Sequence, residues 1–394
     1  MMRQLPREVW VLGLVSLLMD LSSEMIHSLL PLYLVGSLGA SALDVGLIEG
    51  LSESLALIVK IFSGSLSDYL GQRKKLVVLG YGLSALSKLL FPLASSSGWV
   101  LIARCTDRFG KGIRGAPRDA LVADVTPADQ RGAAFGLRQS LDTTGALLGP
   151  LIAFVWLSHS PSTLQTIFWI AVIPSFLAVG LLWMGIKDDQ SPHPRAAQNP
   201  IRWKSLSQLG TPFLSLLVLG AILSLARFSE AFLVLKAEQS GLMIAQIPLV
   251  MVAMNLTFSL SAYPFGRLAD FWSPRILLGL GLGLLIASDC LLSKATGSLE
   301  TLLGIGLWGL HLGLTQGLMS KWIADTAPAS LRGTAFGLFN LVAGVTLFLG
   351  NLLAGWLWDA QGASLTFLTG ALFAALALLG VLLGPGLNAR CKRS

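Results

Sequence analysis

Three titratable side chains share one face of the apolar segment near residues 9 to 35. Asp20, Glu24 and His27 are spaced by four and three residues, so in a helix they fall within an arc of about 60°. An unpaired charge at the centre of a bilayer costs about 2.5 to 3.5 kcal/mol, so such groups normally face a cavity or one another. Oxygen and nitrogen atoms at this spacing can carry protons, and they can also ligate a divalent metal ion.

Further carboxylates follow the same helical spacing in two other apolar segments. Glu49 and Glu53 lie four residues apart, and so do Arg138 and Asp142. A carboxylate held between cations and low-dielectric walls can change its protonation state near neutral pH, which a proton carrier requires. The alternative is that these charges form internal salt bridges that hold helices together. The proton-coupling residues that we predict are Asp20, Glu24, Glu49, Glu53 and Asp142.

The segment near residues 98 to 124 holds the densest group of charges. Its ionisable side chains fall within about 120° if the segment stays helical, although Gly110, Gly112, Gly115 and Pro117 make a local break plausible. Cations on one helix face can bind the anionic group of a substrate, whereas Arg118 is closer to the end of the segment and favours structure or gating. We predict that the substrate-binding residues are Arg104, Asp107, Arg108, Lys111, Arg114 and Arg138, together with Arg227 and Glu230 in the second half.

The composition requires that membrane-spanning helices position these groups. Of 394 residues, 54% are hydrophobic and 12% are charged, whereas a soluble domain carries about 25% charged residues. A spanning helix needs about 20 apolar residues, so the length allows about twelve spans. No His-Glu-x-x-His, Gly-x-Ser-x-Gly or phosphate-binding Gly-x-x-x-x-Gly-Lys motif occurs, which argues against an enzyme. The three cysteines follow no metal-binding spacing, and we expect no cofactor.

Positive charge is distributed unevenly between the loops. The loops that would face the cytoplasm hold Arg73, Lys74, Lys75 and Arg131, and the loops at the other side, near 36 to 42 and 159 to 163, hold no Lys or Arg. This pattern predicts a multi-pass protein of the inner (plasma) membrane with both termini in the cytoplasm. It also accounts for much of the formal charge of +7 without a nucleic-acid partner. The partners that we expect are the lipid bilayer, a small-molecule substrate and protons, with the chain acting as a monomer.

An internal repeat divides the chain into two halves. Residues 123–137 match residues 324–338 at ten of fifteen positions, and Gly64 and Asp68 correspond to Gly266 and Asp270 at an offset of 202. Repeats of six spans are parallel, and transporters use such repeats to move around a site at the membrane midplane. We predict a six-helix bundle at residues 1–186, a cytoplasmic linker at 187–208, and a second six-helix bundle with a short cytoplasmic tail at 209–394.

Several motifs resemble the major facilitator superfamily over nearly the whole chain. Gly64-Ser-Leu-Ser-Asp68-Tyr-Leu-Gly71-Gln-Arg73 is similar to that family's signature loop between helices 2 and 3, and residues 266–275 resemble its weaker copy. The Gly-Lys-Gly-Ile-Arg segment at 110–114 is similar to an incompletely characterised prokaryotic branch. The resemblance implies an all-α membrane fold of twelve transmembrane helices in two pseudo-symmetric six-helix bundles. The gating residues that we expect are Gly64, Asp68, Gly71, Arg73, Asp124, Arg131, Asp270, Arg275, Asp325 and Arg332.

The charge pattern favours secondary active transport by alternating access. The predicted fourth helix, near residues 98 to 124, carries cations, and the first two helices carry the carboxylates of Asp20, Glu24, Glu49 and Glu53. This combination predicts proton-coupled export of a small organic or amphiphilic anion. The alternative is transport of a divalent metal ion or an anionic, siderophore-like metal chelate, with Asp20, Glu24 and His27 as ligands. The basic residues of the segment near 98 to 124 oppose a bare cation. An anionic chelate would fit both features.

Overall fold

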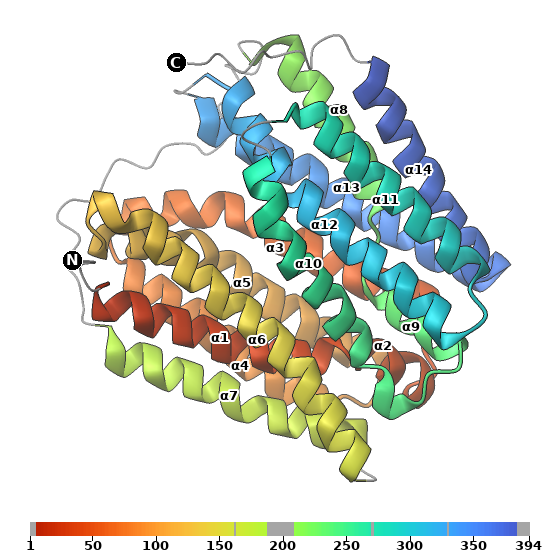
Figure 1. Ribbon diagram of the computed structural model, residues 1–394. Coiled ribbons are helices and arrows are strands. Elements are labelled where there is room, and N and C mark those ends of the chain that lie inside the picture. Colours follow the sequence, from red (N-terminus) through yellow and green to blue (C-terminus); the bar gives the residue numbers. More distant parts are fainter. Residues whose placement is uncertain (1–4, 161–162, 187–208, 269–271, 329–330, 384–394) are drawn as a thin grey trace.

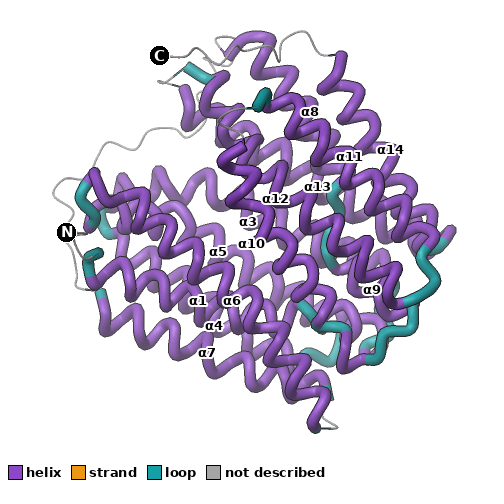
Figure 2. The backbone as a smooth tube through the Cα atoms, in the orientation of Figure 1, coloured by secondary structure: helices purple, strands orange, loops and turns teal. Residues whose placement is uncertain are grey.

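A computed structural model of the chain describes residues 5–160, 163–186, 209–268, 272–328 and 331–383. All regular secondary structure in these ranges is helical (Figure 2). The predicted linker at 187–208 and the predicted gating residue Asp270 lie outside the described residues, as does the side chain of Asp325.

The helices follow one another in two similar series. The first is coloured red to yellow-green in Figure 1 and comprises α1 (Arg7–His27), α2 (Leu30–Leu32), α3 (Ala42–Leu70), α4 (Arg73–Leu93), α5 (Ser97–Val125), α6 (Arg131–His159) and α7 (Leu164–Gly185). The second is green to blue and comprises α8 (Gly210–Ala226), α9 (Ala231–Gln239), α10 (Leu249–Leu268), α11 (Pro274–Lys294), α12 (Ser298–Thr326), α13 (Arg332–Gln361) and α14 (Ala363–Leu383).

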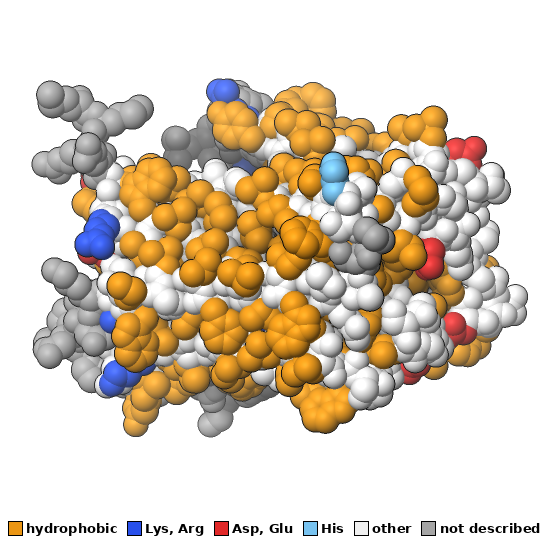
Figure 3. Space-filling model, turned by 90° about the horizontal axis from the view of Figure 1, so that it is seen from below, with side chains coloured by type: hydrophobic (Ala, Val, Ile, Leu, Met, Phe, Trp, Pro, Cys, Tyr) orange, Lys and Arg blue, Asp and Glu red, His pale blue; other side chains and the backbone are white. Residues whose placement is uncertain are grey.

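The length and polarity of these helices suit a bilayer. Ten spans in the described residues are long and apolar enough to cross a membrane. The helices α3 and α5, each of 29 residues, reach about 43 Å but are too polar to be counted among these ten. With these two helices the described part of the chain has twelve crossings, which confirms the predicted fold class. Figure 3 shows hydrophobic side chains over most of one face, with Lys and Arg gathered at one end and Asp and Glu at the other.

The two series pack in the same order, which makes the halves pseudo-symmetric. In the first half α1 packs on α6 and α7, α4 packs on α5 and α7, and α3 packs on α5. In the second half α8 packs on α13 and α14, α11 packs on α12 and α14, and α10 packs on α12. The pairs correspond one to one when α1, α3, α4, α5, α6 and α7 are matched with α8, α10, α11, α12, α13 and α14. The fold is therefore that of two parallel six-helix repeats.

The halves meet closely at one membrane face. We call the face at which α1 begins and α14 ends the basic face, and the other the opposite face. The helix α3 packs along α13, and a Cβ atom added to Gly355 would lie only 2.5 Å from the carbonyl oxygen of Ala42. Glycine there lets the two backbones approach. The backbone N–H groups of Ala42 and Leu43 donate to the carboxylate of Asp359 at 3.0 and 2.8 Å. A carboxylate of α13 thus caps the first turn of α3 and closes the opposite face.

Replacing Asp359 should open this closed face. Loss of a helix cap costs about 0.5 to 2 kcal/mol, so Asp359→Ala should raise the population open at the opposite face by about 2-fold to 30-fold. The measurement is the thiol-labelling rate of an Ala42→Cys probe in a chain whose native cysteines are replaced by serine. Asp44→Ala is the matched control, because Asp44 accepts from the Ser41 backbone N–H at 3.0 Å within its own helix. Equal labelling in the Asp359 and Asp44 variants would contradict this role.

Candidate functional site

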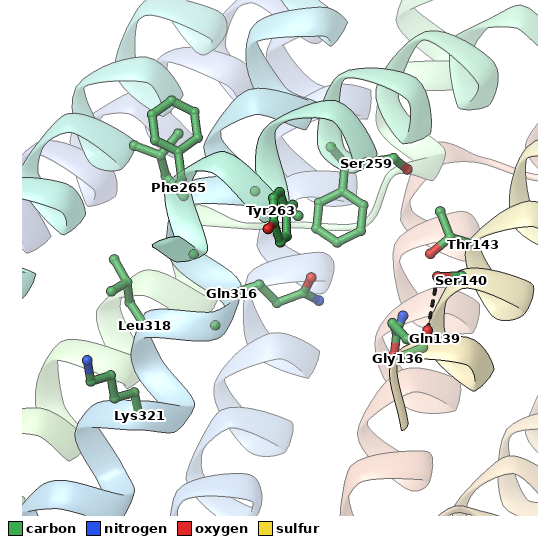
Figure 4. A pocket seen from close by; sticks show the side chains of 16 residues that line it. Gly136, Gln139, Ser140, Thr143, Ser259, Tyr263, Phe265, Gln316, Leu318 and Lys321 are labelled. Atoms are coloured by element: carbon green, nitrogen blue, oxygen red, sulfur yellow. Dashed lines mark hydrogen bonds between the residues drawn. The ribbon is translucent and has the colours of Figure 1, made fainter. Parts of the chain in front are cut away.

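Two adjoining cavities lie between the halves on the side of the basic face. The first, which we call the charged cavity, has a volume of about 410 Å³. Its walls include Asp20, Glu24, Glu53, Lys60, Lys111, Arg114, Arg118, Asp119, Gln139, Asp142, Thr143, Asn255 and Phe258. The second, which we call the wide cavity, has a volume of about 860 Å³ and is lined by residues of α6, α10 and α12 (Figure 4).

The helix α5 presents its charges as one continuous face. It runs unbroken from Ser97 to Val125, so the local break that the glycines and Pro117 made plausible is absent. A Cβ atom added to Gly112 would lie 2.7 Å from Cβ of Val59 on α3. Close packing, and not a change of direction, therefore requires glycine at that position. The intact helix keeps Arg104, Arg108 and Lys111 on one side.

The deepest charges of α5 are neutralised within the protein. The Arg104 guanidinium donates a hydrogen bond to the Glu49 carboxylate and lies 3.7 Å from Glu53. Arg108 Nε lies 2.9 Å from Oε1 of Glu53. The Ser229 hydroxyl, which belongs to the second half, donates to Glu49 Oε2 at 3.3 Å. Glu49 thus joins the two halves and does not line either cavity, whereas Glu53 reaches the charged cavity.

A second buried ion pair involves a lysine that the sequence reasoning missed. Lys88 Nζ on α4 lies 3.2 Å from Asp107 Oδ1, and the two side chains are 0% and 2% exposed. Asp107, which we predicted to bind substrate, lies outside the walls of both cavities and is held by Lys88. The signal for Lys88 was present in the sequence, because it is an isolated cation in the apolar segment near 76 to 95.

Three cations of α5 remain at the wall of the charged cavity, together with Lys60 of α3. The Arg114 guanidinium donates to the Ser84 hydroxyl and lies 4.5 Å from the centre of the Tyr81 ring. Arg118 Nη1 donates to the Ser16 hydroxyl at 2.9 Å. Within the described residues Lys111 forms no ion pair at salt-bridge distance. Its side chain lines the charged cavity and is exposed. Lys60 of α3 is likewise exposed at this wall and forms no ion pair within the described residues, so Lys111 and Lys60 are the cations most available to an incoming anion.

Four of the five predicted proton-coupling residues line this same cavity. Asp20 and Glu24 approach it from α1, Glu53 from α3 and Asp142 from α6. Arg138, a predicted substrate ligand, does not line either cavity and donates to Asp142 Oδ2 at 2.6 Å. Carboxylates and cations therefore line one polar space, and Asp20 and Glu24 reach it from one face of α1, as their helical spacing indicated.

The alternative metal-ligand set does not assemble. Glu24 Oε1 lies 3.6 Å from Nδ1 of His27, and the His27 ring faces Arg108, whose Nη2 lies 2.9 Å from Nε2. Over the part of the chain that the structure describes, no group of three His, Cys, Asp or Glu side chains could hold a metal ion. The positive charge of Arg108 beside the imidazole opposes cation binding there.

The first span of the second half is not one continuous helix. The apolar segment near 209 to 238 is interrupted, because α8 ends at Ala226 and α9 begins at Ala231. Arg227 and Glu230 lie in this interruption and not on one continuous helix face. Neither residue lines the charged or the wide cavity. The same interruption presents Ser229, whose backbone N–H donates to Asn351 Oδ1 at 2.7 Å.

The signature loop forms a compact latch at the basic face. Gly71 ends α3 with a φ of 62°, a left-handed conformation that favours glycine. The Arg73 guanidinium donates to Asp124 at the end of α5 and to Asp68 at 3.3 Å. Arg131 donates to the carbonyl oxygen of Ala123 at 3.2 Å. These predicted gating residues thus meet within the first half. A Cβ atom added to Gly64 would lie 3.5 Å from Cβ of Ala116 on α5, which is ordinary van der Waals contact. Arg275 lies in the first turn of α11, and Arg332 is the first residue of α13.

Comparison with known proteins gives a consistent picture. The sequence matches the family described as Major Facilitator Superfamily over residues 12–235 and 216–389. It is 31% identical over 381 residues to an uncharacterized MFS-type transporter of Methanocaldococcus jannaschii, covering 95% of this chain and 94% of that protein. It is 26% identical to the inner membrane transport protein YajR of Escherichia coli, covering 94% and 81%. It is 23% identical to the quinolone resistance protein NorA of Staphylococcus aureus, covering 90% and 91%.

The solved structures agree on the fold. A POT family transporter in complex with 5-aminolevulinic acid superposes with a TM-score of 0.79 at 13% identity and covers 96% of this chain and 95% of its own. Similarity at this level of identity concerns only the arrangement of the helices. It carries no information about the side chains of the charged cavity.

Proposed function

Because this chain belongs to the major facilitator superfamily, and is a membrane transporter and not an enzyme, we propose that it exports a small organic or amphiphilic anion in a proton-coupled cycle of alternating access. The observation that carries the proposal is the charged cavity between the halves. Cations and carboxylates line one polar space there, at the position where parallel-repeat transporters hold their substrates.

The closed opposite face and the cavities at the basic face support alternating access. The Asp359 cap seals one end of the interface, and the two cavities lie toward the other. Clusters of Lys and Arg favour the cytoplasmic side of a membrane. We therefore assign the basic face and both termini to the cytoplasm, and this conformation to the inward-open state. The export direction draws on the similarity to a relative that is named for quinolone resistance.

The cations of the charged cavity support an anionic substrate. Arg114 and Arg118 are fixed by hydrogen bonds to Ser84 and Ser16, which orients their guanidinium groups. A guanidinium or ammonium group binds a carboxylate, sulfonate or phosphate through charge-assisted hydrogen bonds. Lys111 completes this set from the same helix.

The carboxylates supply a physical route to coupling. Asp20, Glu24, Glu53 and Asp142 share the cavity with the cations, so each proton taken up changes the electrostatic potential that the anion meets. Proton binding and anion binding are then thermodynamically linked, and the linkage acts in both directions. Such a link is the requirement for a proton gradient to drive transport.

The test is flux of alkyl sulfonates through the purified protein in proteoliposomes with an imposed pH gradient. Flux should rise with the gradient, and Asp20→Asn combined with Glu24→Gln should reduce it to the level without a gradient, because two proton sites are lost from the cavity. Glu8→Gln is the matched control, since Glu8 lies on the same helix in its first turn, outside both cavities. Flux that ignores the gradient, and that the double variant leaves unchanged, would rule out proton coupling through α1.

A further inference from the structure

The charged and wide cavities share part of their walls. Gln139 and Thr143 of α6 and Phe258 of α10 line both spaces. The helices come from different halves of the protein, and Figure 4 shows Gln139 and Thr143 on α6 opposite Ser259 and Tyr263 on α10. A molecule bound in the charged cavity can therefore extend past this shared wall into the wide cavity.

The chemistry of the two walls is different. The charged cavity is lined by cations and carboxylates, whereas the wide cavity presents aromatic and aliphatic side chains with neutral polar groups. Among the described residues that line the wide cavity, Lys321 alone is charged, and it lies near the end of α12. The apolar wall includes Phe258, Tyr263, Phe265, Leu314 and Leu318.

The wide cavity also has the size of a binding space. Its volume of about 860 Å³ is about twice the 410 Å³ of the charged cavity. Both volumes fall in the range of about 300 to 1,000 Å³ that is usual for small-molecule sites. An ion as small as a simple carboxylate would occupy the charged cavity and leave the apolar wall in contact with water, which is unfavourable.

The asymmetry of the interface explains why this space exists. The pseudo-symmetry matches α3 and α13 with α10 and α6, and both pairs cross between the halves. The pair α3 and α13 packs at the glycine contacts around Gly46 and Gly355. The pair α6 and α10 instead borders the wide cavity. Asn255 of α10 donates to the carbonyl oxygen of Ala146 on α6 at 3.3 Å, so this second pair also touches, but it leaves the wide cavity beside the contact.

We propose that the substrate of this transporter is an amphiphile with one anionic group and one extended apolar group. The anionic group occupies the charged cavity at Lys111, and the apolar group lies in the wide cavity against Phe258 and Tyr263. This inference rests on the proposed function and adds the shape and polarity of the substrate to it. Phe258 is then the residue that both parts of the substrate contact.

The test measures binding of straight-chain alkyl sulfonates of increasing length to the protein in lipid nanodiscs, corrected for partition into lipid. Affinity should rise by about 4-fold for each added methylene until the wide cavity is filled. In Phe258→Ala and Tyr263→Ala the gain per methylene should shrink, while the shortest sulfonate binds as before. Gln316→Leu should make the gain steeper, because Gln316 is an exposed polar group of this wall.

A lipid-facing aromatic residue provides the control. Phe176 is 42% exposed on α7 and lies outside both cavities, so Phe176→Ala should keep the wild-type dependence on length. Equal binding of short and long sulfonates to the wild type would overturn the proposal of an amphiphilic substrate. So would a length dependence that is unchanged in both Phe258→Ala and Tyr263→Ala. Either result would still be compatible with transport of a small anion. If no sulfonate of any length binds, the proposed function itself fails.

Discussion

Lys88→Met should lower the free energy of unfolding by about 3 to 5 kcal/mol, because it leaves the carboxylate of Asp107 buried without its counter-ion. Both side chains are almost fully enclosed, at 0% and 2% exposure, and no solvent can take over the role of Lys88. The measurement is unfolding of the purified protein in mixed micelles with increasing sodium dodecyl sulfate, followed by circular dichroism.

Removing both charges should restore most of that loss. A buried ion pair that is replaced by apolar residues of similar volume is often neutral in stability, so Lys88→Met with Asp107→Leu should unfold close to the wild type. Lys111→Met is the matched control, since the same substitution on an exposed cavity lysine should change stability little. A double variant that is as unstable as Lys88→Met alone would show that the pair is not the reason for the loss. Transport that survives in the double variant would assign Asp107 to structure and not to substrate.

Lys111→Ala should weaken binding of the anion by about 10-fold to 150-fold. A hydrogen bond to a charged group contributes about 1.5 to 3 kcal/mol, and each 1.4 kcal/mol corresponds to a factor of ten. Arg114 and Arg118 are already engaged by Ser84 and Ser16, so they cannot move to replace Lys111 without losing those contacts. Binding of a short alkyl sulfonate, measured by calorimetry in nanodiscs, gives the dissociation constant directly.

Two further variants distinguish a direct contact between Lys111 and the anion from a general loss of positive charge. Lys111→Arg keeps the charge at the cavity wall and should retain most of the affinity. Lys75→Ala removes an exposed cation near the basic face, outside both cavities, and should bind the sulfonate as the wild type does. Equal weakening in the Lys75 and Lys111 variants would mean that long-range attraction, and not the cavity, holds the anion.

The sequence determined the class of fold because its evidence is local or repeated. Apolar segments of spanning length predict membrane helices, and the match between 123–137 and 324–338 predicts two parallel halves. The spacing of three and four residues also placed Asp20 and Glu24 on one face of α1, and both line the charged cavity. Periodicity alone was sufficient for these conclusions.

Only the tertiary structure decided which charges meet a partner. Helical spacing gives the direction of a side chain but not the identity of the helix opposite, so it could not separate Asp107, which Lys88 neutralises, from Lys111, which faces the cavity. Residues more than 100 positions apart, such as Glu49 and Ser229, form contacts that no local pattern encodes. The wide cavity lies between α6, α10 and α12, and a void between helices depends on how the two bundles pack against each other, which no local sequence pattern encodes.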